Sequence, residues 1–328
     1  MNMLELLSCP RCGGALVSSQ EGALLRCGAG HEHPVVRGIP RFVPEDNYAR
    51  SFGLQWNVFR QTQLDSHTGT TISRDRLARL LGGSMEPVRG KLVLEAGCGA
   101  GRFTEVMLDA GARVMAVDIS SAVEANQANC GHRPGHAVAQ ADIEQLPFAP
   151  GGFDVVVCIG VLQATPDPER AIAALCAQLK PGGLLVIDHY TYGYATTPSR
   201  AALRKRLLGR SPEDALRTCL RIQAVLWPAH RLLWALRKLP GMARLRERFL
   251  HFSPLVDYHE HYGQIGKTLL RQWAVLDMHD TVTDVFKHLR GVDEIAACLR
   301  GCGMVEVRAW LGGNGVEASA RKGAEEAA

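Results

Sequence analysis

The 328-residue chain contains no stretch of eighteen or more uninterrupted apolar residues, which argues against a membrane-spanning helix. Its first residues, MNMLELLSCP, lack the basic segment and the long apolar run of a secretory signal. Aromatic residues make up only 6% and charged residues 21%, while 46% are hydrophobic, a composition typical of globular proteins. Together these features predict a cytoplasmic globular protein with a core large enough for more than one domain.

The ten cysteines also lack the regular arrangement of a disulfide framework. Three of them cluster near the start of the chain, and most of the others lie singly or in loose pairs within apolar segments. Scattered cysteines in such a chain are mostly buried thiols that act as small hydrophobic residues.

The N-terminal cysteines have the spacing of a zinc site. Cys9 and Cys12 form one pair, and Cys27 with His31 forms a second pair fourteen residues later. Zn²⁺ prefers sulfur and nitrogen ligands in a tetrahedral arrangement. A region of 45 residues with so few apolar groups needs such a staple to fold. His33 is an alternative to His31, and a degenerate ribbon without metal is the remaining alternative.

Short apolar runs alternate with helical patterns in the middle of the chain, which indicates βαβ units and a parallel sheet. Strands are expected at residues 92–96, 113–118, 137–139, 153–159 and 184–188. A helix at 292–299 and two closing strands at 305–311 and 315–321 are expected near the C-terminus.

The first of these strands leads into a turn with glycine at every second position, followed by a helix at 102–109. Glycine allows a sharp turn and close approach of a ligand to the backbone, and the helix start offers free N–H groups. The second strand ends in Asp118, a carboxylate suited to the hydroxyls of a ribose. Arg102 occupies the third position of a G-x-G-x-x-G spacing, where a dinucleotide-binding fold needs a small residue. NAD is therefore disfavoured.

With Glu95 inside the first strand, the pattern E-x-G-x-G-x-G resembles the first motif of class I S-adenosylmethionine-dependent methyltransferases. Further segments are similar to later motifs of that family, in the same order: Asp142 with Ile143, residues 153–160, and the turn KPGG at 180–183. The resemblance implies an α/β fold, with a Rossmann-like sheet and helices on both faces, that binds S-adenosylmethionine. It implies cofactor contacts from Glu95, Gly97, Gly99, Gly101, Asp118, Ile119, Asp142, Ile143 and Ile159.

The catalytic residues are less well marked. Many members of the family carry a histidine where this chain has Ala164, but methyl transfer from a sulfonium depends mainly on positioning and exclusion of water. His189 and Tyr190 follow the fifth strand, where ligands bind in such sheets. His259, in a segment that also contains His261, is a third candidate for a general base. Packing is the alternative role for each, and a second metal site is disfavoured because histidines two apart diverge on a helix.

Two flanking segments add further resemblances. The N-terminal region is similar to small bacterial zinc-ribbon proteins related to activators of tRNA methyltransferases. Residues 51–56 with 62–66 resemble a segment of bacterial fusion proteins that join such a ribbon to a methyltransferase. Trp56 of this segment is expected either to close over the cofactor or, with Phe59, to lie in the core of a helix.

A basic insertion separates the fifth strand from the closing pair. Residues 200–250 contain 13 Lys or Arg and 3 Asp or Glu, whereas the rest of the chain contains 24 and 30. Pro228 is expected to kink or split its helix. The insertion could pack on the main domain, contact an anionic membrane, or bind RNA. One apolar helical face is expected to contain Ile222, Val225, Leu226, Ala229, Leu233 and Leu236.

The chain is therefore divided into a zinc ribbon (1–45), a helical linker or cofactor lid (46–90), a cofactor-binding core (91–189), a helical insertion forming a substrate cap (190–280), the C-terminal part of the core (281–321) and a tail (322–328). The expected activity is methylation of a small-molecule or lipid-linked metabolite at oxygen, nitrogen or carbon. We expect a cytoplasmic enzyme with possible peripheral contact at the inner membrane face. The alternatives are an rRNA or tRNA methyltransferase that grips RNA with ribbon and insertion, and a non-catalytic scaffold.

Overall fold

The computed structural model describes residues 3–19, 22–193, 197–260 and 265–324. Its centre is a seven-stranded sheet in the order β10-β11-β9-β8-β5-β6-β7. These strands are β5 (Leu92–Ala96), β6 (Arg113–Asp118), β7 (His136–Gln140), β8 (Phe153–Cys158), β9 (Leu179–His189), β10 (Met304–Gly312) and β11 (Gly315–Lys322). Strands β5 to β9 pair in parallel, and β11 lies antiparallel between β9 and β10. The expected Rossmann-like α/β sheet is confirmed.

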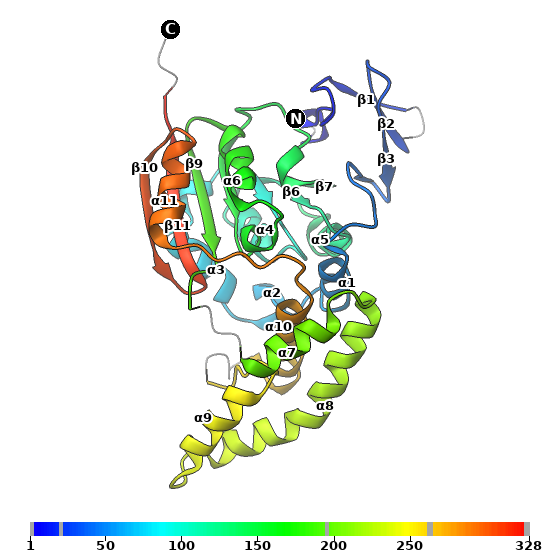
Figure 1. Ribbon diagram of the computed structural model, residues 1–328. Coiled ribbons are helices and arrows are strands. Elements are labelled where there is room, and N and C mark those ends of the chain that lie inside the picture. Colours follow the sequence, from blue (N-terminus) through cyan, green and yellow to red (C-terminus); the bar gives the residue numbers. More distant parts are fainter. Residues whose placement is uncertain (1–2, 20–21, 194–196, 261–264, 325–328) are drawn as a thin grey trace.

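Helices cover both faces of this sheet, as Figure 1 shows. Successive residues of a strand point to opposite faces, so Val93 belongs to one hydrophobic cluster and Leu94 to the other. On one face lie α3 (Ile72–Leu80), α4 (Arg102–Asp109) and α5 (Ala122–Cys130), and on the other lie α6 (Pro168–Ala177) and α11 (Val292–Gly301). Burial on both faces explains why β5 is apolar and buried along its whole length.

Strand β9 begins five residues earlier than expected. Leu179 already pairs with Phe153, and an irregularity in the ladder follows before Val155 pairs with Leu184. The KPGG turn is therefore part of the strand, because its bulge lets the strand continue across the glycines.

The N-terminal region forms a separate antiparallel sheet that contacts the edge of the main one. Backbone N–H of Phe42 donates to the Gln140 carbonyl at the end of β7, over 2.8 Å, and Arg41 pairs with Glu124 of α5. Ile39 is fully buried in one of the two clusters of the main core. Its elements are η1 (Met3–Leu6), β1 (Leu16–Ser18), β2 (Leu24–Cys27), β3 (Glu32–Val36) and β4 (Ile39–Pro40).

The linker forms short helices that lie at the carboxyl ends of the strands. They are α1 (Arg50–Val58), α2 (Asp65–Thr68), α3 and η2 (Glu86–Val88). Helix α1 contacts the start of α5 through Gly53: a Cβ at this position would lie 2.9 Å from the Ser121 backbone nitrogen and in conflict with its hydroxyl. Close approach of these two helices therefore requires glycine here.

The insertion consists of α7 (Pro198–Leu207), α8 (Pro212–Leu236), α9 (Met242–Phe252) and α10 (Lys267–Thr283), with its own hydrophobic cluster. Helix α8 stays a single helix with Pro228 inside it, so the predicted split was wrong. Its ribbon bends along its length in Figure 1.

The predicted apolar face of α8 was also wrong at one residue. Val225 is 75% exposed, whereas the buried positions include Gln223 and His230. Burial follows the tertiary partners, because Gln223 exchanges hydrogen bonds with Arg271 of α10 and His230 bonds to Asp257.

The described residues include no helix with the length and apolarity needed to cross a bilayer. Strand β11 extends to Lys322, so the expected tail starts later than predicted, and residues 325–328 lie outside the described residues.

Replacing Gly53 by alanine should destabilise the protein by about 1–3 kcal/mol, because the added methyl overpacks the contact between α1 and α5. Thermal unfolding of the purified variant measures this loss. Gly301→Ala is the matched control, since a Cβ there meets no heavy atom within 4 Å. Equal melting temperatures for the two variants would contradict the contact.

Candidate functional site

A cavity of about 470 Å³ opens at the carboxyl ends of β5, β6 and β8, a size common for small-molecule sites. Helices α1, α3 and α10 supply much of its remaining wall. Its lining includes Trp56, Arg76, Gly97, Gly99, Arg102, Asp118, Ile119, Ile143, Ile159, Gly160, Val161, Ala164, Tyr190, Tyr258, Trp273, Asp277, Asp280 and Asn314.

Two glycines of the expected loop line this cavity, Gly97 with φ 77° and Gly99 with φ 49°. A Cβ on Gly97 would lie 2.7 Å from Cγ1 of Val161, and a Cβ on Gly99 would lie 3.3 Å from the indole nitrogen of Trp56. Side chains at these positions would therefore fill the space between the loop and the opposite wall.

Asp118 is held in a fixed orientation at the end of β6. Its Oδ2 accepts the Gly99 backbone N–H over 2.9 Å, and its Oδ1 accepts from the backbone and the hydroxyl of Ser120 over 2.8 and 2.7 Å. Burial raises the pKa of this carboxyl above its usual value. The three predicted isoleucines, Ile119, Ile143 and Ile159, line the same cavity and give it apolar walls.

Three predicted cofactor residues lie outside the cavity lining. Glu95 accepts the Thr104 hydroxyl over 2.5 Å within the core, and burial raises its pKa to about 8. A Cβ on Gly101 would lie 3.0 Å from the Cys130 sulfur, so this glycine serves the packing of α4 on α5. Asp142 caps the short helix η3 (Ile143–Gln145) by accepting the backbone N–H of Glu144 over 2.9 Å.

The three candidate bases are not brought together. Tyr190 lines the cavity, but His189 does not; its Nδ1 donates to the Tyr190 carbonyl over 2.8 Å, and burial lowers its pKa. His259 also lies outside the cavity lining, stacked on Trp227 and Trp234 with ring centroids 5.1 and 5.7 Å away. His261 lies outside the described residues.

Two carboxylates that the sequence reading missed line the cavity instead: Asp277 and Asp280, one turn apart on α10. Tyr258 donates its hydroxyl to Asp277, and the Gln55 amide donates to Oδ1 of Asp280 over 2.9 Å. The only sequence signal is their spacing of three in an otherwise largely apolar helix.

The two carboxylates differ in their surroundings. Burial raises the pKa of Asp277 to about 6, with Arg102 among the groups that oppose the rise. Burial raises the pKa of Asp280 to about 7, and the charges of Asp277 and Asp284 raise it further. Asp280 therefore titrates close to neutral pH, where a proton acceptor works best.

Trp56 and Phe59, both on or next to α1, have different roles. Trp56 lines the cavity opposite Gly99, as expected of a lid residue, whereas Phe59 is buried in the hydrophobic cluster of the insertion. The neighbouring Gln55 joins α1 to α10: it accepts from Nδ1 of His279 over 2.7 Å while donating to Asp280. The linker thus contributes to both ends of the cavity.

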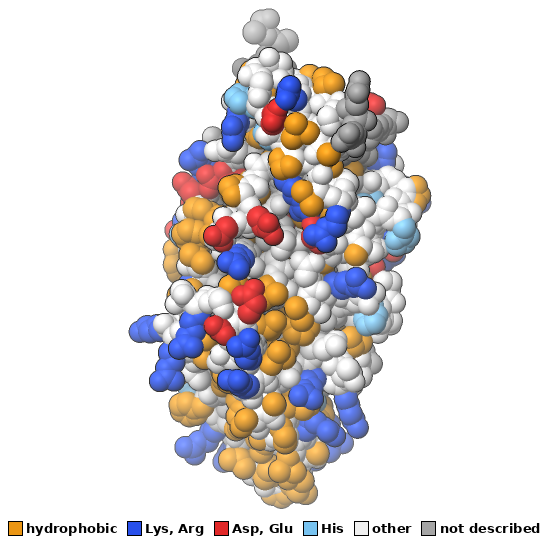
Figure 2. Space-filling view, turned by 90° about the vertical axis from the view of Figure 1, so that its right-hand side faces the viewer, with side chains coloured by type: hydrophobic (Ala, Val, Ile, Leu, Met, Phe, Trp, Pro, Cys, Tyr) orange, Lys and Arg blue, Asp and Glu red, His pale blue; other side chains and the backbone are white. Residues whose placement is uncertain are grey.

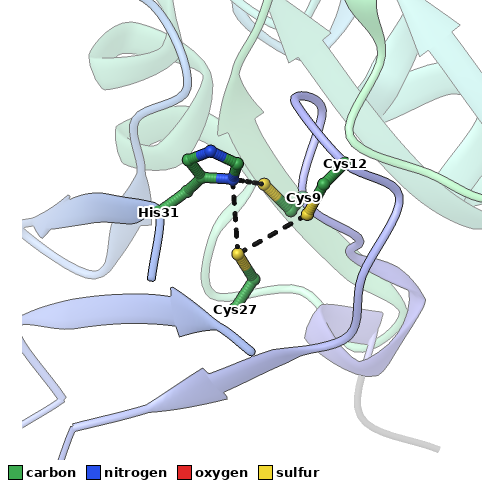
Figure 3. Close-up of side chains that lie close together, drawn as sticks. All are labelled: Cys9, Cys12, Cys27 and His31. Atoms are coloured by element: carbon green, nitrogen blue, oxygen red, sulfur yellow. Dashed lines mark hydrogen bonds between the residues drawn. The ribbon is translucent and has the colours of Figure 1, made fainter. Parts of the chain in front are cut away.

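A second cluster of polar side chains lies in the N-terminal sheet. The Cys9 and Cys27 sulfurs each lie 3.5 Å from Nδ1 of His31, and the Cys12 and Cys27 sulfurs lie 3.6 Å apart (Figure 3). A tetrahedral zinc ion with bonds of about 2.3 Å to sulfur and about 2.0 Å to nitrogen holds its ligand atoms roughly 3.5–3.8 Å apart. These four groups therefore have the chemistry and spacing of a zinc site. The alternative ligand His33 lies 3.4 Å from Cys9 alone.

Comparison with known proteins places the fold and the cavity in a family. The model of a methyltransferase domain family matches residues 94–187. A ubiquinone biosynthesis O-methyltransferase of Coxiella burnetii is 35% identical over 179 residues, which cover 51% of this chain and 70% of that protein. One of Thiobacillus denitrificans is 37% identical over 101 residues, covering 30% and 43%.

Among solved structures, an N-methyltransferase of Bradyrhizobium japonicum in complex with S-adenosyl-L-homocysteine is 30% identical, with a TM-score of 0.32, covering 35% of this chain and 60% of that one. This chain spans between 25% and 43% of the length of five of the curated relatives it matches. The match to the Coxiella protein is the most extensive of those described here, and it includes the strands and the glycine loop that border the cavity. The chain therefore belongs to the class I S-adenosylmethionine-dependent methyltransferases.

Proposed function

We propose that this protein transfers the methyl group of S-adenosylmethionine to a hydroxyl group of a small or lipid-linked metabolite. One observation carries the proposal: the glycine loop, Asp118 and the two carboxylates of α10 line a single cavity. One part of the cavity suits a nucleoside, and the other offers a proton acceptor. Transfer to oxygen is supported by the relatives named ubiquinone biosynthesis O-methyltransferase.

The residues at the glycine loop fit the cofactor. S-adenosylmethionine supplies an electrophilic methyl group when bound. Gly97 and Gly99 leave space for it beside the backbone, and Asp118 offers acceptor oxygens to ribose hydroxyls. Isoleucine side chains 119 and 143 offer apolar contact to an adenine ring.

Asp280 suits the role of proton acceptor for the acceptor hydroxyl. As that oxygen attacks the methyl carbon, its proton passes to the carboxylate of Asp280, which Gln55 holds in place. Asp277, hydrogen-bonded to Tyr258, is better placed to position the acceptor. The absence of a histidine at Ala164 leaves this part of the wall open.

The first prediction concerns cofactor and acceptor together. The purified protein should bind S-adenosylhomocysteine in calorimetry, and Asp118→Ala should weaken binding by about 10-fold or more, because ribose hydroxyls lose their acceptor. With a panel of phenols, catechols and prenylated phenols, S-adenosylhomocysteine should form together with an O-methylated product. Asp109→Ala, on the surface, is the control. Methyl transfer to rRNA or tRNA instead would overturn the proposed substrate class.

The second prediction concerns Asp280. Because the pKa of its carboxyl is raised to about 7 in the fold, the fold favours the protonated form, and that advantage is lost as pH rises through 7. Asp280→Asn should therefore stabilise the protein by on the order of 1–3 kcal/mol above pH 7, and by less at pH 4. The same variant should slow methyl transfer about 100-fold.

Thermal unfolding across this pH range, with Asp293→Asn as the exposed control, measures the first effect, and product formation measures the second. A stabilising effect that does not change with pH would show that Asp280 does not titrate near neutrality.

We also propose that Cys9, Cys12, Cys27 and His31 hold a structural zinc ion. The proposal rests on four converging ligand atoms within 4.8 Å of one another, three of them sulfur. Such a site stabilises a small sheet that has little hydrophobic core of its own.

The third prediction separates the two histidines. Purified protein should contain about one zinc per chain by mass spectrometry. His31→Ala should lose the metal and lower the melting temperature, because the tetrahedral set becomes incomplete, whereas His33→Ala should retain the metal. Retention of zinc by His31→Ala with its loss from His33→Ala would assign the fourth ligand to His33.

A further inference from the structure

The α8–α9 hairpin projects away from the sheet, as Figure 1 shows. Among the described residues that line the cavity, none comes from α8 or α9. The hairpin therefore has a surface whose properties the methyl-transfer site does not explain.

Helix α8 is apolar on two opposite sides. One side carries Cys219 and Trp227, which are buried in the hydrophobic cluster of the insertion. Val225 and Leu232, 75% and 59% exposed, are two turns apart and lie on the far side of the helix at 3.6 residues per turn. A helix that only packs on its own domain needs one apolar side, so the second side calls for a different environment.

The same character continues into α9 and the turn between the helices. No residue of α9 is buried, and its Leu245 and Phe252 are 51% and 65% exposed and again seven residues apart. Leu239, in the turn, is 54% exposed. In Figure 2, hydrophobic side chains gather at the lower end of the molecule, with Lys and Arg side chains around them.

The charges of the hairpin are almost all of one sign. Residues 215–252 contain eight Lys or Arg and a single acidic residue, Glu247. Five of the basic side chains are exposed and have no ion-pair partner among the described residues: Arg221, Arg231, Lys238, Arg244 and Arg248. These cations are therefore available to an anionic partner.

We propose that the α8–α9 hairpin is a docking surface for an anionic lipid bilayer. The exposed aliphatic and Phe side chains enter the interfacial layer, and the surrounding cations bind phosphate headgroups. A nucleic acid would be complementary to the cations but would leave Val225, Leu232, Leu239 and Leu245 in water. A bilayer satisfies both, and this goes beyond the proposed methyl transfer.

Vesicle flotation tests the proposal with the full chain. Wild type should float with vesicles of phosphatidylcholine containing about 30% phosphatidylglycerol, and much less with phosphatidylcholine alone, because the headgroup charge is missing. Raising the salt to about 0.5 M should weaken binding through screening.

Two variants divide the apolar and the ionic contributions. The quadruple change Val225→Ser, Leu232→Ser, Leu245→Ser and Phe252→Ser should lower the bound fraction by about 10-fold or more, since these side chains are exposed and their loss leaves the fold intact. Arg231→Glu with Arg244→Glu should have a comparable effect at low salt. Leu311→Ser is the matched control, because Leu311 is 69% exposed on β10.

The outcomes are distinct from those of the methyltransferase proposal. Hairpin variants should bind S-adenosylhomocysteine like wild type, because the described cavity lining contains no hairpin residue. Wild type that fails to float with anionic vesicles, or hairpin variants that float like wild type, would overturn the membrane proposal. So would wild type that binds an RNA duplex and not vesicles, or a dimer in sedimentation that the quadruple variant dissolves.

Discussion

Strand β5 pairs in parallel with β6 on one side and with β8 on the other, and the site depends on this double pairing. The chain leaves β5, builds outward to β7 and then returns to β8, so the connections after β5 and β8 diverge. Divergent connections leave a crevice at the carboxyl ends of the strands. Gly97, which follows β5, and Gly160, which follows β8, border that crevice. The linker and the insertion then enclose it, which excludes water from a reaction that depends mainly on positioning.

The parts of the fold with local signals were predictable from the sequence. The strand at 92–96 and the helix at 102–109 have their expected bounds, because an apolar run, a glycine turn and an amphipathic helix follow one another without interruption. Gly97, Gly99 and Asp118 line the cavity for the same reason. The four N-terminal ligands were also visible, since metal ligands come in closely spaced pairs.

The remaining features depend on contacts between distant segments. Gln55 and Asp280 are separated by 225 positions, and no local pattern links them. Glu95 was assigned to the cofactor by family motif, whereas its side chain turns inward to Thr104. Val225 fits an apolar helical face, but α8 is oriented by polar contacts of Gln223 and His230 that a hydrophobicity pattern does not register. Sequence patterns specify which side chains are apolar, and tertiary partners decide which of them are covered.

The N-terminal sheet has a consequence for how copies of this protein behave at high concentration. An open strand at the side of a sheet offers unpaired N–H and C=O groups to a neighbouring molecule. At β7 the backbone of Phe42 occupies part of that position, so the ribbon shields this strand from another chain. At the opposite side, β10 has an irregularity between Val305 and Arg308, with Glu306 at φ 50°, which interrupts a regular ladder. Loss of the ribbon would therefore expose a pairing surface and favour aggregation, independently of any effect on methyl transfer.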